Sequence, residues 1–213
     1  MKRLIFYFDP ISPFAYLAFE RLPQALQGIS YEVEYRPLLF AGLLQHWGNV
    51  GPAEIEPKRM WTFRHVHWLA ASHGIRLDTP AAHPFNPLPL LRLALASAVD
   101  FKPNRWVVEA IVQHVWHGGG DPADAQRLAS LTARVAPAHD PAGAAVKQAL
   151  RGNTDAALAA GVFGVPTVEL EGRHFWGLDS LPMLRDALQG GAWFDGPGWD
   201  AQGLPREGVL RKR

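Results

Sequence analysis

The chain has 213 residues, with 21 lysines and arginines against 20 aspartates and glutamates, so its formal net charge is +1. With 48% hydrophobic and 19% charged residues, it has the composition of an ordinary globular protein. The balanced charge argues against a nucleic-acid or membrane-surface ligand, because both usually require a concentrated basic patch. The chain contains no cysteine, which excludes disulfides, thiolate metal sites, dithiol redox chemistry and cysteine nucleophiles.

No targeting signal is predicted at the start of the chain. The apolar stretch 4–8 before Asp9 is too short for the apolar region of a signal peptide. No run of about eighteen apolar residues occurs, so no transmembrane helix is predicted. We therefore expect a soluble, cytoplasmic protein.

Strand and helix signals alternate at the beginning of the chain. The apolar run 4–8 ends at Asp9 and predicts a short buried strand. Ser12 and Pro13 then begin a helix, because serine is a good N-cap and proline suits the first helical position. The alternating segment 31–36 predicts a second strand, which completes a strand–helix–strand unit.

The middle of the chain lacks strand signals and predicts helices separated by glycine- and proline-rich breaks. The predicted helices are 59–73, 88–99, 105–116, 124–135 and 140–160. Strands return at 166–170 and 174–176, joined by a hairpin turn, and a last helix is predicted over 179–188. This order predicts an α/β domain whose sheet is interrupted by a large all-helical insertion.

Ser12 is the first candidate functional residue. As an N-cap it needs no further role, which is the ordinary explanation of a serine before a helix. A helix N-terminus also favours an anion, and a serine hydroxyl there can donate a hydrogen bond to a thiolate. A hydrolase-type nucleophile is not supported, because no G-x-S-x-G motif surrounds Ser12.

Two later motifs each have a structural and a functional interpretation. Pro166 is tolerated at the start of a strand, but a cis Val165-Pro166 bond would expose the Val165 backbone to an extended peptide ligand. Asp179 or Ser180, after Leu178, caps the last helix. Alternatively this helix start binds a carboxylate while Asp179 pairs with an ammonium group, an arrangement that suits the end of an α-amino acid.

Histidines and basic residues give weaker signals. His114 and His117 share a helix face without neighbouring acids, which is poor evidence for zinc, so no metal site is predicted. A basic cluster next to two tryptophans could hold an aromatic carboxylate, although a solvated helix face explains it equally well. The cluster consists of Lys58, Arg59 and Arg64.

Together, several segments resemble the 2-hydroxychromene-2-carboxylate isomerases and the kappa-class glutathione transferases, over about residues 3 to 190. The segments are 8–17, 48–52, 57–59, 85–86, 163–167 and 176–179. Their order and spacing make the combination specific. The resemblance implies a thioredoxin-like α/β fold. Its expected parts are a discontinuous thioredoxin-like domain (1–38 and 161–190), a helical insertion subdomain (39–160) and a C-terminal tail (191–213).

The resemblance also implies a glutathione site. Ser12 matches the family's active-site serine, which hydrogen-bonds the glutathione sulfur. Val165, ahead of the cis-proline match Pro166, would pair with the cysteinyl part, and Asn49 matches a further glutathione contact. The segment that grips the γ-glutamyl end is matched by Leu178, Asp179 and Ser180. Ser180 departs from the arginine that the family has at that position.

In a chain without cysteine, such a site implies that a ligand brings the sulfur. We predict a glutathione-dependent cis–trans isomerase of an unsaturated aromatic carboxylate of the 2-hydroxychromene-2-carboxylate type. Glutathione thiolate would add reversibly to the substrate while Ser12 steadies it, and the basic cluster would hold the substrate carboxylate. The alternatives are a kappa-type transferase that conjugates glutathione to electrophiles and a non-catalytic protein that binds an extended ligand. Family members often form dimers, so a homodimer is expected.

Overall fold

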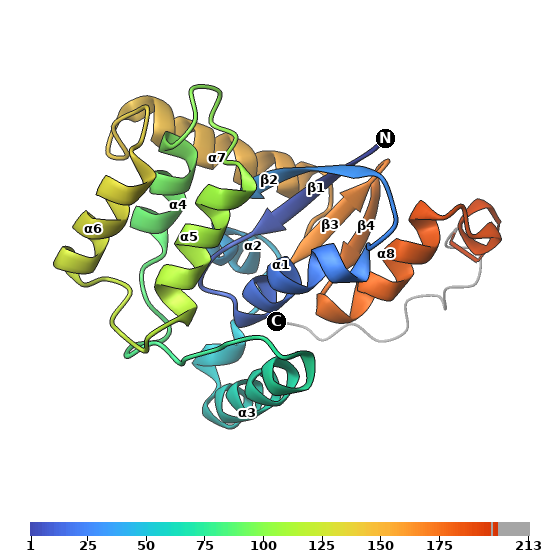
Figure 1. The fold of residues 1–213 in the computed structure, drawn as a ribbon, viewed down its shortest axis with the longest axis horizontal. Helices are drawn as coiled ribbons and strands as arrows, with labels where there is room; N and C mark the ends of the chain where they lie inside the picture. Colours follow the sequence, from blue (N-terminus) through green and yellow to red (C-terminus); the bar gives the residue numbers. More distant parts are fainter. Residues whose placement is uncertain (197, 200–213) are drawn as a thin grey trace.

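The computed structural model describes residues 1–196, 198 and 199. Four strands form one mixed sheet in the order β2-β1-β3-β4 (Figure 1). The strands are β1 (Lys2–Phe8), β2 (Tyr31–Pro37), β3 (Thr167–Leu170) and β4 (Arg173–Trp176). β1 is parallel to β2 and antiparallel to β3, and β4 is antiparallel to β3. The predicted strands are therefore confirmed.

Helices connect and cover this sheet. α1 (Pro13–Ala25) joins the two parallel strands, and α8 (Leu181–Leu188) follows β4. The other α-helices of the described chain all lie between β2 and β3 in sequence. They are α2 (Phe40–His46), α3 (Glu56–His73), α4 (Leu88–Ala96), α5 (Arg105–Trp116), α6 (Ala125–Val135) and α7 (Ala144–Ala159). The predicted α/β order, a sheet interrupted by a helical insertion, is confirmed.

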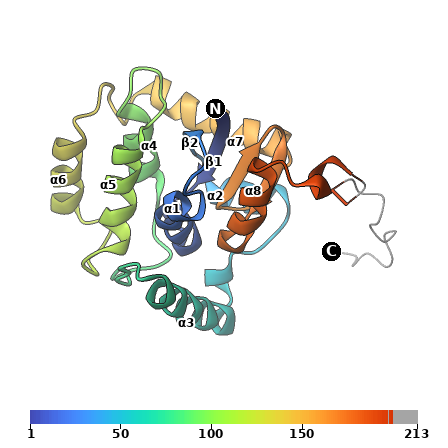
Figure 2. The same cartoon turned by 45° about the vertical axis from the view of Figure 1, so that its right-hand side comes forward.

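The two faces of the sheet are covered by different helices, because successive side chains of a strand point to opposite faces. Leu4 and Phe6 of β1 pack in the larger core with α1 and α8, whereas Tyr7 packs on the other face with α2 and α7. In Figure 1 and Figure 2, α4, α5 and α6 lie side by side beyond the β2 edge of the sheet, α8 lies near the β4 edge, and α3 lies apart from them. The larger core continues from the sheet into α5 and α6 of the insertion. The predicted boundaries between a thioredoxin-like domain and an insertion subdomain stay predictions.

Several helix boundaries differ from the prediction. The sequence pattern did not predict α2, because seven residues are too few to display a helical period. α4 ends at Ala96 and α8 begins at Leu181, both inside their predicted limits. α7 begins at Ala144 because Asp140 Oδ1 accepts the N–H of Ala142 (2.8 Å), in a turn that competes with the helix.

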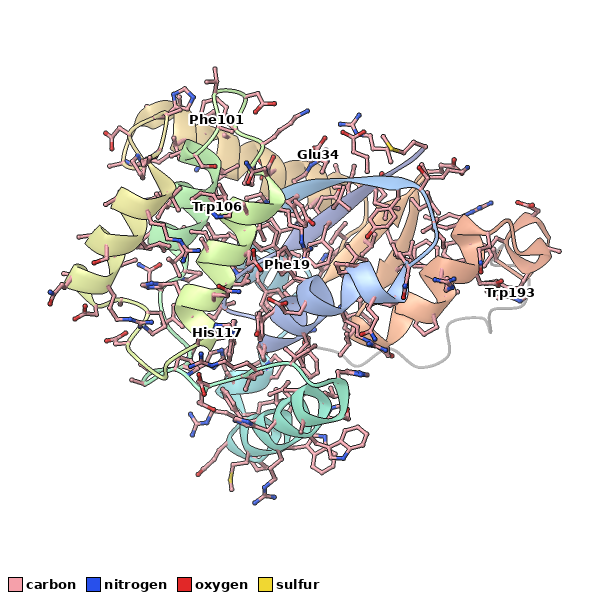
Figure 3. All side chains as sticks on the ribbon, in the orientation of Figure 1. Phe19, Glu34, Phe101, Trp106, His117 and Trp193 are labelled. Atoms are coloured by element: carbon pink, nitrogen blue, oxygen red, sulfur yellow. The ribbon has the colours of Figure 1, made fainter. Side chains whose placement is uncertain are left out.

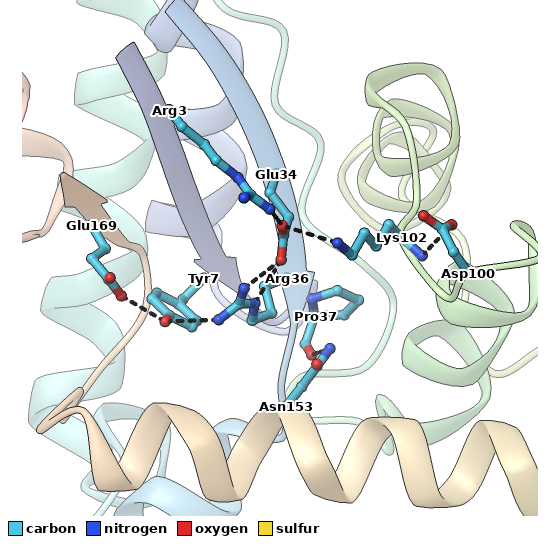
Figure 4. A network of polar contacts seen from close by, with 9 residues as sticks. All are labelled: Arg3, Tyr7, Glu34, Arg36, Pro37, Asp100, Lys102, Asn153 and Glu169. Carbon is cyan, nitrogen blue, oxygen red and sulfur yellow. Dashed lines mark hydrogen bonds and ion pairs between the residues drawn. The ribbon is translucent and has the colours of Figure 1, made fainter. Parts of the chain in front are cut away.

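A polar network ties three strands together on the face that α7 covers (Figure 4). Tyr7 Oη donates to Glu169 Oε2 (2.8 Å) and accepts from Arg36 Nη1 (3.2 Å). Arg36 also pairs with Glu34, and Lys102 approaches the same carboxylate at 3.5 Å. Burial and the neighbouring Glu169 raise the pKa of Tyr7 to about 12, so the hydroxyl stays a donor at neutral pH. The network fixes how β2, β1 and β3 are aligned.

The described part of the predicted tail packs on β4. Residues 192–195 form a 3₁₀ turn, and the buried ring of Phe194 lies 6.0 Å from that of Phe175, centroid to centroid. Residue 197 and residues 200–213, the rest of that tail, lie outside the described residues. Among the helices that are described, none has the length and apolar character needed to cross a membrane.

Candidate functional site

Three connections of the chain meet at one edge of the sheet. Because β1 is antiparallel to β3 and β3 to β4, the end of β1, the start of β3 and the end of β4 lie together. Tyr7, Thr167 and Trp176 form one row across these strands. The N–H of Gly177 donates to Pro166 O (2.9 Å), which continues the pairing beyond the strands. The sequence-predicted residues Ser12, Val165, Pro166, Leu178, Asp179 and Ser180 are thereby brought to the same edge.

Ser12 is the N-cap of α1 and is 8% exposed. Its Oγ accepts the N–H of Ala15 (3.2 Å), so the hydroxyl hydrogen is left to point elsewhere. It points at the carbonyl oxygen of Val165, 3.5 Å away, which is a long hydrogen bond. Pro13 has no N–H, and the N–H of Phe14 has no protein acceptor in the described part of the chain. The helix start therefore offers one unpaired N–H and one weakly engaged O–H.

The Val165-Pro166 peptide bond is cis, which agrees with the functional interpretation of this motif. Both residues are buried, and the Val165 carbonyl faces Ser12. Within the described residues, the Val165 N–H donates to no protein group. Buried backbone donors are nearly always paired, so an unpaired N–H beside Ser12 is a candidate contact for a ligand.

The segment after β4 forms the third side of the site. Residues 178–180 make a 3₁₀ turn in front of α8, with Leu178 buried and Asp179 exposed. Ser180 Oγ donates to Gly177 O (2.8 Å) and does not cap α8. Gly177 has φ +92°, and a Cβ there would lie 2.5 Å from Asp179 Oδ1. Glycine is therefore required for the Asp179 carboxylate to fold back over this turn.

Asn49 follows α2 and makes no hydrogen bond with Ser12 in the described part of the chain. It is exposed after the end of α2, where its Oδ1 accepts the N–H of Val50 (2.9 Å). The end of α2 is tied to the segment before Val165, since Trp47 Nε1 donates to Val162 O (3.1 Å). This contact places Asn49 two residues from a direct link to the cis-proline segment.

The three members of the basic cluster have different surroundings on α3. Arg59 acts on His83: burial lowers the pKa of His83, and the positive charge of Arg59 lowers it further. Arg64 is two residues before the buried Val66, which is a rotation of about 200° around a helix, so Arg64 points away from the core. Lys58 is exposed in the first turn of α3. His83 contacts the residue before Ser12, so Arg59 is the basic residue that the structure connects to the site.

Sequence reasoning missed Asp9, whose side chain is fully buried at the end of β1. Its Oδ1 accepts the N–H of Ile11 (3.0 Å) and its Oδ2 accepts the N–H of Phe40 (3.0 Å). Burial raises the pKa of Asp9 to about 7, against the opposing effect of these two N–H groups. An acid directly after a buried strand and three residues before an N-cap was the signal available in the sequence.

Two exposed aromatic side chains beside the site were also missed. The rings of Phe163 and Trp176 lie 5.0 Å apart, centroid to centroid. A Cβ on Gly164 would lie 2.6 Å from Trp176 Nε1, so the indole lies directly across the backbone that leads to Val165. These rings form an apolar surface within two residues of Val165. Over the described residues, no group of three His, Asp or Glu side chains could hold a metal ion.

The sheet order, the cis-proline and the helix N-terminus facing it define a thioredoxin-like protein with serine at the helix start. The family model described as "DSBA-like thioredoxin domain" matches residues 3–189, and the chain belongs to this family. It is similar to 2-hydroxychromene-2-carboxylate isomerase from Sphingobium xenophagum, with 30% identity over 200 residues, 88% of this chain and 98% of the relative.

A second relative and a solved structure extend the comparison. The chain is 26% identical to glutathione S-transferase kappa 2 from Caenorhabditis elegans over 207 residues, 88% of this chain and 92% of the relative. The solved structure is a 2-hydroxychromene-2-carboxylate isomerase, with a TM-score of 0.77 and 26% identity over 91% of this chain and 97% of that one. The resemblance and the thioredoxin-like fold are confirmed, and the named relatives are enzymes.

Proposed function

We propose that this chain is a glutathione-dependent cis–trans isomerase of an unsaturated aromatic carboxylate, of the 2-hydroxychromene-2-carboxylate type. The observation that carries the proposal is the position of Ser12. Its hydroxyl lies at the start of α1, 3.5 Å from the carbonyl of Val165 and next to an unpaired N–H, in a chain without cysteine. Such a site favours an anion and lacks its own sulfur, which fits a thiolate supplied by a ligand.

The residues present fit glutathione. An extended peptide pairs with unpaired backbone groups, and a cysteinyl residue paired with Val165 would bring its thiol next to Ser12. The turn at Leu178, Asp179 and Ser180 would hold the γ-glutamyl end, with the Asp179 carboxylate on the ammonium group. Asn49 would hold the far end from its position after α2. The Ser180 hydroxyl donates to Gly177 O, so Ser180 would contribute less to binding of the γ-glutamyl end than an arginine would.

The substrate would lie on the open side of the thiol. Arg59 is proposed to hold its carboxylate, with Lys58 beside it on α3, whereas the direction of Arg64 argues against a role for that residue. Phe163 and Trp176 offer an aromatic surface next to Val165, against which a flat ring can stack. The name of the Sphingobium relative, 2-hydroxychromene-2-carboxylate isomerase, supports this class of substrate.

Bound glutathione would supply a thiolate that adds reversibly to the conjugated double bond, so that the carbon–carbon bond can rotate before the sulfur–carbon bond breaks and the double bond re-forms. Ser12 would donate its hydrogen bond to the sulfur when it is anionic, and the N–H of Phe14 and the start of α1 would add to that stabilisation. Arg59 would hold the carboxylate still while the rest of the substrate rotates. The burial of Ser12 keeps competing water away from this hydrogen bond.

The test is the stoichiometry of glutathione. The purified chain is given a 2-hydroxychromene-2-carboxylate and reduced glutathione, while the isomers and the total free thiol are followed together. We expect a rate that saturates with glutathione and a thiol concentration that stays constant over many turnovers. An equal rate without glutathione contradicts the proposal.

The same experiment tests the kappa-type transferase, which the 26% identity to a kappa transferase favours as the second candidate. Conjugation forms the same sulfur–carbon bond but keeps it. One thiol would then be lost for each electrophile consumed, and a thioether product would accumulate.

A further inference from the structure

We infer that His83 and Trp116 are positioning residues for Ser12: they hold the loop between β1 and α1 by its carbonyl groups, while Asp9 holds it by its N–H groups. We call residues 9–12 the Ser12 loop. The inference rests on the proposed function and goes beyond it, because neither side chain belongs to the glutathione site described above. Two peptide units precede Ser12 in this loop.

The first peptide unit joins Pro10 to Ile11. Its carbonyl oxygen accepts the indole Nε1–H of Trp116 (3.0 Å), and its N–H donates to Asp9 Oδ1 (3.0 Å). Trp116 is fully buried at the end of α5, and Nε1 is the only polar atom of its side chain. Both polar groups of this peptide unit are therefore fixed by buried partners.

The second peptide unit joins Ile11 to Ser12. Its carbonyl oxygen pairs with His83 Nε2 (2.9 Å), and its N–H donates to Asp9 O (3.0 Å). A carbonyl can only accept, so His83 carries its hydrogen on Nε2. Nδ1 of His83 is buried and has no partner in the described part of the chain. The one hydrogen bond of this imidazole is therefore made to the loop.

The donors come from the helical insertion and not from the sheet. Trp116 ends α5, and His83 lies between α3 and α4, packed against the rings of Phe63 (5.2 Å) and Trp116 (5.9 Å). Figure 3 labels His117, the next residue after Trp116, at the end of α5 that lies toward α3. On the other side, Asp9 Oδ2 binds the N–H of Phe40 at the start of α2. The insertion thus contacts the loop from α2, from α5 and from the connection to α4.

Two fully fixed peptide units immediately before Ser12 leave its Cα little freedom. A displacement of about 1 Å at a reacting group can lower a rate by about a hundredfold, so the direction of the Ser12 hydroxyl matters for a thiolate. Loss of the Trp116 or the His83 donor would leave one of these carbonyl groups without its hydrogen bond. We expect the loop to become more mobile and the Ser12 hydroxyl to be aimed less well.

The experiment compares Trp116→Phe, which keeps a ring but removes the N–H donor, with His83→Leu and His83→Gln. The Gln amide can still donate to Ile11 O and should restore most of the loss seen with Leu. Two readouts are used: amide hydrogen exchange at Ile11 and Ser12 in the free protein, and the pH midpoint of thiolate absorbance of added reduced glutathione. We expect exchange to rise about five- to tenfold and the thiol midpoint to rise by about half a unit in Trp116→Phe and His83→Leu.

The control is Tyr16→Phe. Tyr16 stacks on Trp116 (6.3 Å between centroids), and its hydroxyl donates to Arg76 O and pairs with His117 Nε2 (2.9 Å), neither of which belongs to the Ser12 loop. The variant removes these two partly buried hydrogen bonds in the same neighbourhood, so it should lower the melting temperature without changing either readout.

Unchanged exchange and an unchanged thiol midpoint in both Trp116→Phe and His83→Leu would overturn the inference, and so would equal effects of Tyr16→Phe. If the wild-type chain does not ionise glutathione at all, the proposed function fails. In that case the exchange rates, which need no glutathione, still decide whether the two side chains hold the loop.

Discussion

Replacing Ser12 by alanine is expected to leave glutathione bound but largely protonated at neutral pH. The hydroxyl is the side-chain donor that we propose for the sulfur, and in the structure it makes only a long hydrogen bond to Val165 O (3.5 Å). A hydrogen bond to a charged group contributes about 1.5–3 kcal/mol, and about 1.4 kcal/mol corresponds to one pKa unit. The pKa of the bound thiol should therefore rise by about one to two units. Isomerisation at neutral pH should fall about ten- to a hundredfold.

The variant also removes a helix cap, since Ser12 Oγ accepts the N–H of Ala15 (3.2 Å), and this costs about 1 kcal/mol of stability. Asn104→Ala is the matched control. Asn104 Oδ1 accepts the N–H of Val107 (3.0 Å) at the start of α5, so its loss removes a comparable cap far from the thiol. Equal thiol ionisation in wild type, Ser12→Ala and Asn104→Ala, measured by ultraviolet absorbance across pH, would show that Ser12 is only a cap.

Asp9→Asn is expected to change how stability depends on pH. Burial raises the pKa of Asp9 in the folded chain to about 7 from its ordinary value of 3.8. The folded state therefore binds the proton more tightly than the unfolded state. The stability that this proton contributes is complete below pH 3.8. It falls as the pH rises from 3.8 to about 7, and it is lost above that range. The shift corresponds to a loss of about 4 kcal/mol across that pH range.

Asparagine cannot ionise, so the variant lacks this dependence. The NH2 group of asparagine would face the N–H of Ile11 or of Phe40, where aspartate has an accepting oxygen. A buried donor is then left unpaired, which lowers the free energy of unfolding by about 1–3 kcal/mol. Urea unfolding should show the variant less stable than wild type near the acid end of that pH range, with the difference shrinking or reversing above it. Asn104→Ala changes no ionisable group, so its difference from wild type should be flat with pH. An equally flat difference for Asp9→Asn would contradict the assignment.

Much of the fold followed from local patterns. The apolar run of β1, the Ser12-Pro13 helix start and the hairpin between β3 and β4 are signals carried by adjacent residues. α2 is too short to show a period, and the late start of α7 depends on the turn that Asp140 makes. The two misses have different causes: α2 is short, whereas a local hydrogen bond sets the start of α7.

The residues of the candidate site that belong to sequence motifs could be predicted. The residues whose role depends on burial and on distant partners could not. Ser12, Val165 and Asp179 belong to short motifs with a known resemblance, and the topology brings them to one edge. The environments of Asp9 and Trp116 depend on partners that are distant in sequence, such as Phe40 for Asp9 and Pro10 for Trp116. No local pattern reports such pairs, so their part in holding the Ser12 loop could be found only from the structure.

The most direct measurement is a calorimetric titration of reduced glutathione into the full-length chain at neutral pH, with the ultraviolet difference spectrum recorded on the same samples. Saturable heat together with a thiolate band below the ordinary thiol pKa of about 8.5 is the expected result. The S-methyl derivative of glutathione should bind without that band. If reduced glutathione gives no saturable heat, or if it binds and its thiol ionises only at its ordinary pKa, the thiolate site at Ser12 is contradicted.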